Sequence, residues 1–187
     1  SLIYFRLTPV CCLIINTKFI KNSPFDLNMK IDDWFEKYKF KCGYFKDIER
    51  LVKLKKEKKQ KISVCIPTLN EEEGLGKVIS TIKESLMDEY KLIDEIIVID
   101  SGSTDNTKNV AIEHGAKFYL AEDYLKIYGK ARGKGENLWK SLYLAEGDII
   151  CWVDADIKNI HPRFVYGLIG PLLTNDKLYF TKAFYQR

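Results

Sequence analysis

The sequence predicts an α/β fold in which a mainly parallel β-sheet is covered by helices on both faces. Segments rich in β-branched residues alternate along the chain with segments of helical periodicity. Each predicted strand is apolar throughout, as expected of strands that are buried on both faces. The chain has 187 residues, of which 46% are hydrophobic and 30% are charged, so it can bury the core of one globular domain.

The elements follow one another regularly from residue 61 onward. A β-branched strand at 61–67 ends on a proline. The helical pattern at 72–87 then places five apolar side chains on one stripe: Leu75, Val78, Ile79, Ile82 and Leu86. The further predicted elements are a strand at 94–100, a capped helix at 103–115 closed by Gly115, a strand at 116–120, a helix at 134–147 and a strand at 148–154.

The chain before residue 61 departs from this pattern. We expect three regions, which are an apolar, irregular leader at 1–28, a basic helical leader at 29–60 and the domain at 61–187. Arg6 and Pro9 interrupt the apolar run of the first leader, which is too short to span a bilayer. Because Met29 resembles a natural start, we interpret residues 1–28 as upstream translation or a poorly packed arm.

Basic residues are concentrated in the second leader. Residues 30–61 contain 12 Lys and Arg against 6 Asp and Glu, whereas the whole chain has a formal net charge of +4. We interpret residues 46–61 as a solvated helix with acids near its start and lysines near its end, which suits the helix dipole. A nucleic-acid-binding protein would carry its basic surface on the folded domain, so we expect no nucleic-acid partner.

Cysteine usage argues against a zinc centre. The five cysteines form no C-x-x-C pair, and the chain has only two histidines. Cys65 and Cys151 fall within predicted strands, where a free thiol behaves as a small hydrophobe. This pattern favours a reducing, cytoplasmic compartment.

Polar loops follow all four of the predicted parallel strands. They read "PTLNEE", "DSGSTD", "GKARGKGE" and "DAD" in chain order. Right-handed crossovers place the carboxyl ends of such strands on one edge of the sheet, where ligands bind in open α/β folds. Taken alone, "LNEE" is typical of a helix start capped by Asn70, "SGSTD" of a turn and cap, "GKARGKG" of a flexible loop and "DAD" of a strand exit. Four polar loops on one edge favour a binding site.

The residue types in these loops suit a nucleotide diphosphate. Of the carboxylates Asp154 and Asp156, one can bind Mg²⁺ or Mn²⁺ while the other orients a ribose or sugar hydroxyl. Lys134 stands between two glycines that let the backbone approach a phosphate or base. The chain has neither a glycine-rich dinucleotide fingerprint after the first strand nor a P-loop, which argues against NAD and against an ATPase.

Several segments together resemble the GT-A glycosyltransferases, and in particular the glucosyl-3-phosphoglycerate synthases. They are "ISVCIPTLNEEEGLGKVI", "DEIIVIDSGSTDNT", "GKGENLW", "GDIICWVDADIKNIHPRFVYGLIGPLL" and "KAFYQR". The first two occur in many GT-A transferases, whereas the later ones are particular to this synthase group. The resemblance covers roughly residues 60–187 and implies a Rossmann-like nucleotide-sugar-binding domain that is incomplete at its C-terminus.

The resemblance also implies roles for individual residues. The nucleotide-sugar contacts would be Pro67, Thr68, Leu69, Asn70, Glu71, Ser101, Lys134, Asp154 and Ala155. Asp156 would hold the divalent metal, Mg²⁺ or Mn²⁺, which stabilises the leaving diphosphate. No residue is assigned as a catalytic nucleophile. Gln186 stands where the family usually has the first of two arginines.

The implied activity is a metal-dependent, retaining transfer of glucose from an NDP-glucose to 3-phosphoglycerate. UDP-glucose is the expected donor, although the sequence does not distinguish UDP from GDP or glucose from mannose. The acceptor site would lie mostly beyond Arg187, so this stretch alone would transfer poorly. Because edge strands of the sheet would be exposed, we also expect the chain to self-associate into a homodimer.

Three alternatives stay open. A polyprenyl-phosphate sugar transferase shares the first two motifs, and the apolar N-terminus could touch a membrane. A non-catalytic nucleotide-binding module would use the same loops. Nucleic-acid binding by the lysine-rich leader is the weakest of the three and predicts steeply salt-dependent binding.

Overall fold

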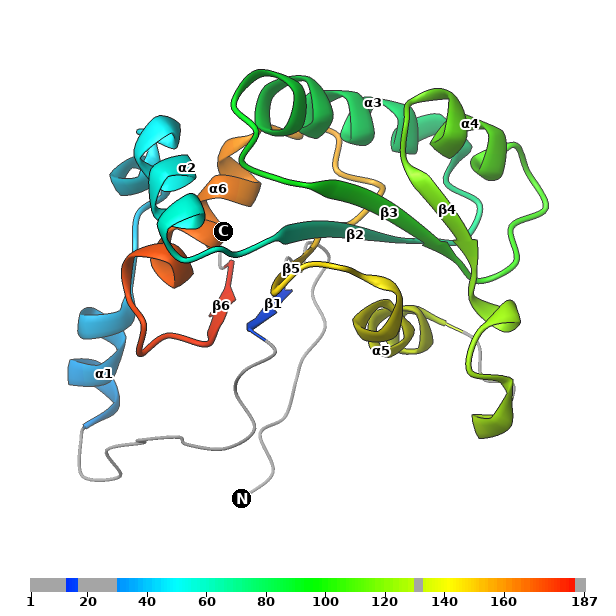
Figure 1. Cartoon of the computed structure of the whole chain (residues 1–187). Helices are drawn as coiled ribbons and strands as arrows, with labels where there is room; N and C mark the ends of the chain where they lie inside the picture. The colour runs from blue at the N-terminus through cyan, green and yellow to red at the C-terminus, as the bar shows by residue number, and fades with distance from the viewer. Residues whose placement is uncertain (1–12, 17–29, 130–132, 184–187) are drawn as a thin grey trace.

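A computed structural model describes residues 13–16, 30–129 and 133–183 of the chain (Figure 1). The strands are β1 Leu13–Asn16, β2 Ile62–Thr68, β3 Glu95–Asp100, β4 Lys117–Leu120, β5 Ile149–Trp152 and β6 Phe180–Lys182. The α-helices are α1 Ile31–Tyr38, α2 Ile48–Glu57, α3 Glu72–Ile82, α4 Thr107–Glu113, α5 Lys134–Leu144 and α6 Arg163–Thr174. Shorter helical turns are η2 Cys42–Phe45, η3 Lys83–Glu89, η4 Ala121–Asp123 and η5 Lys126–Tyr128.

The strands form one mixed sheet in the order β4-β3-β2-β5-β1-β6. β4, β3, β2 and β5 run parallel, whereas β1 and β6 are antiparallel additions beyond β5. The predicted α/β fold with a mainly parallel sheet is therefore confirmed. β1 falls within the predicted leader at 1–28, and the rest of that leader lies outside the described residues.

Helices cover both faces of the parallel strands (Figure 1). α3 and α4 lie on one face, and α5 lies on the other. The predicted stripe is confirmed, because Leu75, Val78, Ile79, Ile82 and Leu86 are fully buried. The same core cluster includes the apolar side of α6, so α3 and α6 share one core. Cys65 and Cys151 are also fully buried, as the strand prediction required.

α2 forms as predicted, but one of its sides is buried rather than solvated. Asp47 caps the helix by accepting a hydrogen bond from the Arg50 N–H at 3.0 Å. Leu51 is 1% exposed because this side of α2 packs on α6. Lys55 is buried as well, and its Nζ contacts Asp94 Oδ2 at 2.7 Å. The run of lysines concealed an amphipathic helix, because a lysine can bury its stem and pair its ammonium.

A polar cluster lies at the edge of the sheet where β2, β3 and β4 begin. Glu95 Oε1 accepts hydrogen bonds from Ser63 Oγ at 2.5 Å and from the Glu146 N–H at 2.7 Å. Glu95 Oε2 accepts from Lys117 Nζ at 2.8 Å. Burial raises the pKa of Glu95, but the hydrogen bonds from Lys117, Ser63 and the Glu146 backbone outweigh it and leave the pKa below its ordinary value.

This cluster predicts a stability effect that depends on pH. We expect Glu95→Gln to lower the free energy of unfolding by about 1–3 kcal/mol near pH 7, because buried donors lose a charged acceptor. The folded pKa of Glu95 lies below the unfolded value of 4.5, so its contribution is complete above 4.5 and is lost as pH falls through the folded pKa. Urea unfolding near pH 7 and again near pH 3 measures both effects.

Glu113→Gln is the control, since Glu113 is an exposed glutamate on α4. We expect this variant to match the wild type within about 0.5 kcal/mol. If Glu95→Gln lowered the free energy of unfolding by the same amount at both pH values, the stabilising role of the charged Glu95 carboxylate would be contradicted.

Gly74 allows α3 to approach the loop after β5. A Cβ atom at this position would lie 2.8 Å from the Ala155 carbonyl oxygen, closer than a real contact permits. We expect Gly74→Ala to destabilise the fold, because overpacking costs about 1–3 kcal/mol and exceeds the 0.5–1 kcal/mol or so that alanine adds to a helix interior. Gly43→Ala is the control, since nothing lies within 4 Å of its added methyl. Urea unfolding in which Gly74→Ala is as stable as the wild type would rule out this close packing.

Candidate donor-binding site

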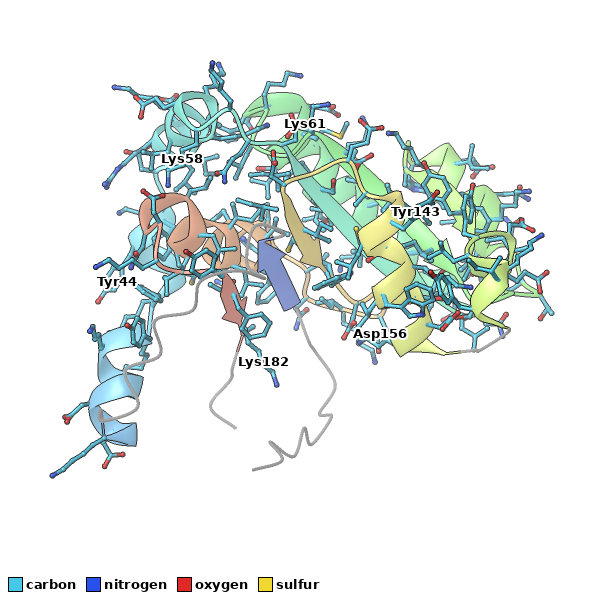
Figure 2. The ribbon with its side chains drawn as sticks, turned by 60° about the horizontal axis from the view of Figure 1, so that its bottom comes forward. Tyr44, Lys58, Lys61, Tyr143, Asp156 and Lys182 are labelled. Atoms are coloured by element: carbon cyan, nitrogen blue, oxygen red, sulfur yellow. The ribbon has the colours of Figure 1, made fainter. Side chains whose placement is uncertain are left out.

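The candidate site lies where the parallel strands end. β2 and β3 end level with each other, because Thr68 pairs with Asp100 in the ladder. β5 ends with Trp152 opposite Cys65, and the chain continues directly into the predicted acidic pair. The loops after β2, β3 and β5 therefore share one edge of the sheet, as predicted. Figure 2 shows Asp156 at this edge.

The Asp100 carboxylate organises the loop after β3. Asp100 is 1% exposed, and its Oδ2 accepts hydrogen bonds from the Gly102 N–H at 3.0 Å and the Ser103 N–H at 2.7 Å. Its Oδ1 accepts from Ser103 Oγ at 2.5 Å and from Thr68 Oγ1 at 3.3 Å. The sequence reading missed this role, although an acid that ends an apolar strand was a signal for it.

The loops after β2 and β3 brace each other through reciprocal hydrogen bonds. Asn70 donates its N–H to Ser103 Oγ at 2.8 Å and accepts from the Thr104 N–H through Oδ1 at 2.9 Å. Glu72 accepts from the Asn106 N–H at 2.7 Å. Each loop thus supplies both donors and acceptors to the other, which gives the two loops one relative position.

The predicted helix cap at Asn70 is wrong. α3 begins after Glu71 and has no side-chain cap, because the Asn70 side chain reaches the neighbouring loop instead. Asn70 adopts a left-handed conformation with φ of 57°, which asparagine tolerates better than most residues. The Glu71 N–H at the start of α3 donates to Thr107 Oγ1 at 2.9 Å. An orphan donor of one helix is therefore satisfied by the next helix rather than by its own cap.

Ser101 and a residue that the sequence reading missed connect the edge to α5. Ser101 is half-buried, and its Oγ donates to Asn137 Oδ1 at 3.0 Å. Asn137 is 2% exposed, and its Nδ2 donates to the Ile99 carbonyl at 2.8 Å. The buried side chains of α5 are Asn137, Lys140 and Ser141, so no apolar stripe in the sequence marked this face of the helix.

Lys134 and Asp154 join the start of α5 to the loop after β5. Lys134 is the first residue of α5 and follows Gly133, whose φ of 115° suits glycine. Lys134 Nζ forms an ion pair with Asp154 Oδ1. The Asp154 side chain is only 11% exposed, whereas that of Lys134 is 43% exposed. An ammonium that a ligand can reach therefore lies next to a largely buried carboxylate.

Glu71, Asp154 and Asp156 gather their carboxylates in one region. Burial raises the pKa of Glu71 above its ordinary value, and the negative charges of Asp156, Asp105 and Asp154 raise it further. Asp156 is exposed, while Ala155 between the two aspartates is buried with its carbonyl against Gly74. Because alanine has no polar side-chain atom, Ala155 could offer a ligand only its backbone groups.

This acidic region suits a divalent cation in its chemistry. Carboxylate oxygens are the ligands that Mg²⁺ and Mn²⁺ prefer, and a cation would relieve the mutual repulsion of these acids. Within the described part of the chain, no group of three or more His, Cys, Asp and Glu side chains is arranged to hold a metal. The two aspartates can supply only part of an oxygen shell, so a diphosphate, water or further residues must supply the remainder.

The other predicted contacts differ in how much they offer a ligand. Leu69 is 52% exposed, an exposure that suits packing on a base or ribose. Pro67 is half-buried. Thr68 is 3% exposed and binds Asp100 through its hydroxyl, so its side chain holds the edge together. None of the helices in the described ranges is long and apolar enough to cross a membrane.

Comparison with known proteins shows related sequences. The family model described as Glycosyl transferase family 2 matches residues 63–186. The chain is 54% identical over 151 residues to a glucosyl-3-phosphoglycerate synthase from Petrotoga mobilis, covering 81% of this chain and 46% of that protein. It is 48% identical over 126 residues to a glucosyl-3-phosphoglycerate synthase from Mycolicibacterium paratuberculosis, covering 67% of this chain and 37% of that protein. The chain thus spans less than half of these relatives.

Solved structures show the same fold. The crystal structure of mannosyl-3-phosphoglycerate synthase from Rubrobacter xylanophilus matches with a TM-score of 0.72 and 34% identity, over 76% of this chain and 46% of that one. Glucosyl-3-phosphoglycerate synthase from Mycobacterium tuberculosis, solved with Mn²⁺, UDP and glucosyl-3-phosphoglycerate, matches with a TM-score of 0.63 and 45% identity, over 69% of this chain and 44% of that one. The parallel sheet with helices on both faces is accordingly the GT-A fold, and with the match over residues 63–186 this chain belongs to glycosyl transferase family 2.

Proposed function

We propose that this chain forms the donor-binding part of an enzyme that transfers glucose from UDP-glucose to 3-phosphoglycerate. The observation that carries the proposal is the Lys134–Asp154 ion pair beside the exposed Asp156 at the carboxyl edge of the sheet. An ammonium and two carboxylates at the edge where an open α/β sheet binds its ligand support a site for a metal and a diphosphate. The relatives named for this reaction, and the structure solved with Mn²⁺ and UDP, support the same donor.

The loops divide the donor among them. We assign the nucleoside to Leu69 and Ser101, since one offers an apolar surface and the other a hydroxyl. We assign Lys134 to a donor phosphate or the ribose, because its ammonium is partly exposed and can exchange Asp154 for an anionic ligand. Asp154 would then accept from a sugar hydroxyl, and the Asn70 and Glu71 backbone would border the pocket.

Asp156 is the residue we assign to a divalent cation, with Asp154 and Glu71 nearby. Mn²⁺ is supported by the relatives' structures, and Mg²⁺ is expected to serve as well. When bound, the ion supplies Lewis-acid stabilisation of the leaving diphosphate. Retention of the anomeric configuration is a prediction from the family resemblance. A cytoplasmic location and a homodimer are predictions as well.

The metal assignment predicts that Asp156→Ala loses metal-dependent nucleotide binding. We expect the affinity for UDP in the presence of Mn²⁺ to fall about tenfold or more, a free-energy loss of at least about 1.4 kcal/mol. Calorimetric titration with UDP, with and without Mn²⁺, measures it. Asp33→Ala, at an exposed aspartate of α1, is the control and should bind as the wild type does. If Asp156→Ala bound UDP as the wild type does, the assignment of the metal to Asp156 would be wrong.

The activity itself is tested by product analysis with the full-length protein. We expect label from UDP-glucose to appear in glucosyl-3-phosphoglycerate when 3-phosphoglycerate is present, with the anomeric configuration of the donor retained in NMR spectra. A polyprenyl phosphate forms the second arm, because the chain is also 34% identical over 106 residues to an undecaprenyl-phosphate sugar transferase from Proteus mirabilis. Transfer to the lipid alone would overturn the proposed acceptor, and UDP binding without any transfer would indicate a non-catalytic module.

A further inference from the structure

Asn137 occupies an unusual position at the candidate site. It lies on the inner face of α5, one turn after Lys134, and is 2% exposed. Its side chain reaches the ends of β2 and β3, where Nδ2 donates to the Ile99 carbonyl at 2.8 Å and lies 3.5 Å from the Thr68 carbonyl. Its Oδ1 lies 3.0 Å from Ser101 Oγ.

The Ile99 and Thr68 carbonyls define the orientation of the Asn137 amide. In the opposite orientation, the amide oxygen would face the Ile99 carbonyl oxygen at hydrogen-bond distance, and two acceptors repel each other. The NH₂ group must therefore face Ile99, which leaves Oδ1 facing Ser101. Because an amide oxygen can only accept, the hydrogen bond between them uses the proton of the Ser101 hydroxyl.

This hydrogen bond decides what Ser101 can offer a ligand. A serine hydroxyl has one proton and two lone pairs. With its proton directed at Asn137, Ser101 presents only lone pairs to a ligand at this edge of the sheet. Such a hydroxyl accepts from a donor, such as the N3–H of uracil or a ribose hydroxyl, and rejects a group that is itself only an acceptor.

We propose that Asn137 is a positioning residue that makes Ser101 an obligate hydrogen-bond acceptor toward the nucleoside of the donor. The inference rests on the proposed function, because it needs a nucleoside next to Ser101. It goes beyond a packing role, since Asn137 sets the polarity of the contact through the direction of one proton. A buried donor or acceptor left unmatched costs more than a good pair contributes, so this polarity discriminates between ligands.

The test compares UDP with two analogues that each lack one donor group. 3-Methyl-UDP lacks the N3–H of the base, and 2′-deoxy-UDP lacks a ribose hydroxyl. Each is titrated with Mn²⁺ into the wild type, Asn137→Ala, Ser101→Ala and the double variant. We expect the wild type to prefer UDP about tenfold over one analogue, which identifies the group that Ser101 accepts from.

The variants separate polarity from packing. We expect Asn137→Ala to reduce the preference for UDP over that analogue to about twofold or less. The double variant should discriminate no less than Ser101→Ala alone, because the two residues act through one contact. Asn109→Ala, at an exposed asparagine of α4, is the control.

Each remaining outcome is decisive. If Asn137→Ala weakens UDP and both analogues by the same factor, the role is structural and the proposal is overturned. Where Asn137→Ala does not fold, Asn137→Ser takes its place, because its hydroxyl is too short to reach both partners. A wild type that binds UDP without preferring it over either analogue overturns the role of Asn137 alone. A wild type that binds no UDP overturns the proposed function as well.

Discussion

The buried Asp100 carboxylate is the contact on which the edge of the sheet depends. It ties the end of β2, through Thr68, to the backbone of the loop after β3. The hydrogen bonds of Asn70 and Glu72 further restrict the relative position of the two loops, which Asp100 already holds together. Hydrogen bonds to a charged acceptor are stronger than neutral ones, so the loops that would hold a nucleotide are ordered before any ligand arrives.

The opposite side of the site is built on electrostatics instead. α5 brings Lys134 to Asp154, and the residue just before α3, Glu71, lies close to the same acids. Within the described residues, the region therefore places the Lys134 ammonium among several carboxylates, and both Lys134 and Asp156 are exposed. A diphosphate with its metal carries both signs and can replace these contacts without leaving a buried charge unpaired, which is the condition for binding in a partly desolvated site.

Much of the fold could be predicted because it depends on local patterns. The apolar strands and the α3 stripe report burial directly, and the rule for parallel strands places their loops on one edge. The errors arose where a side chain contacts a distant segment. Asn70 has the composition of a helix cap but bonds Thr104 in another loop, and Lys55 has the composition of a solvated residue but is buried against Asp94.

By itself, the sequence determined the alternation of strands and helices, the edge of the sheet where the polar loops meet, and the residue types there that suit a metal and a nucleotide diphosphate. Only the tertiary structure decided which groups Asp100 and Asn137 contact. Asp100 lies 32 residues from Thr68, and Asn137 lies 36 residues from Ser101. Periodicity reports which face of an element is buried, but a hydrogen bond between separate elements depends on strand register and helix docking, which no local pattern encodes.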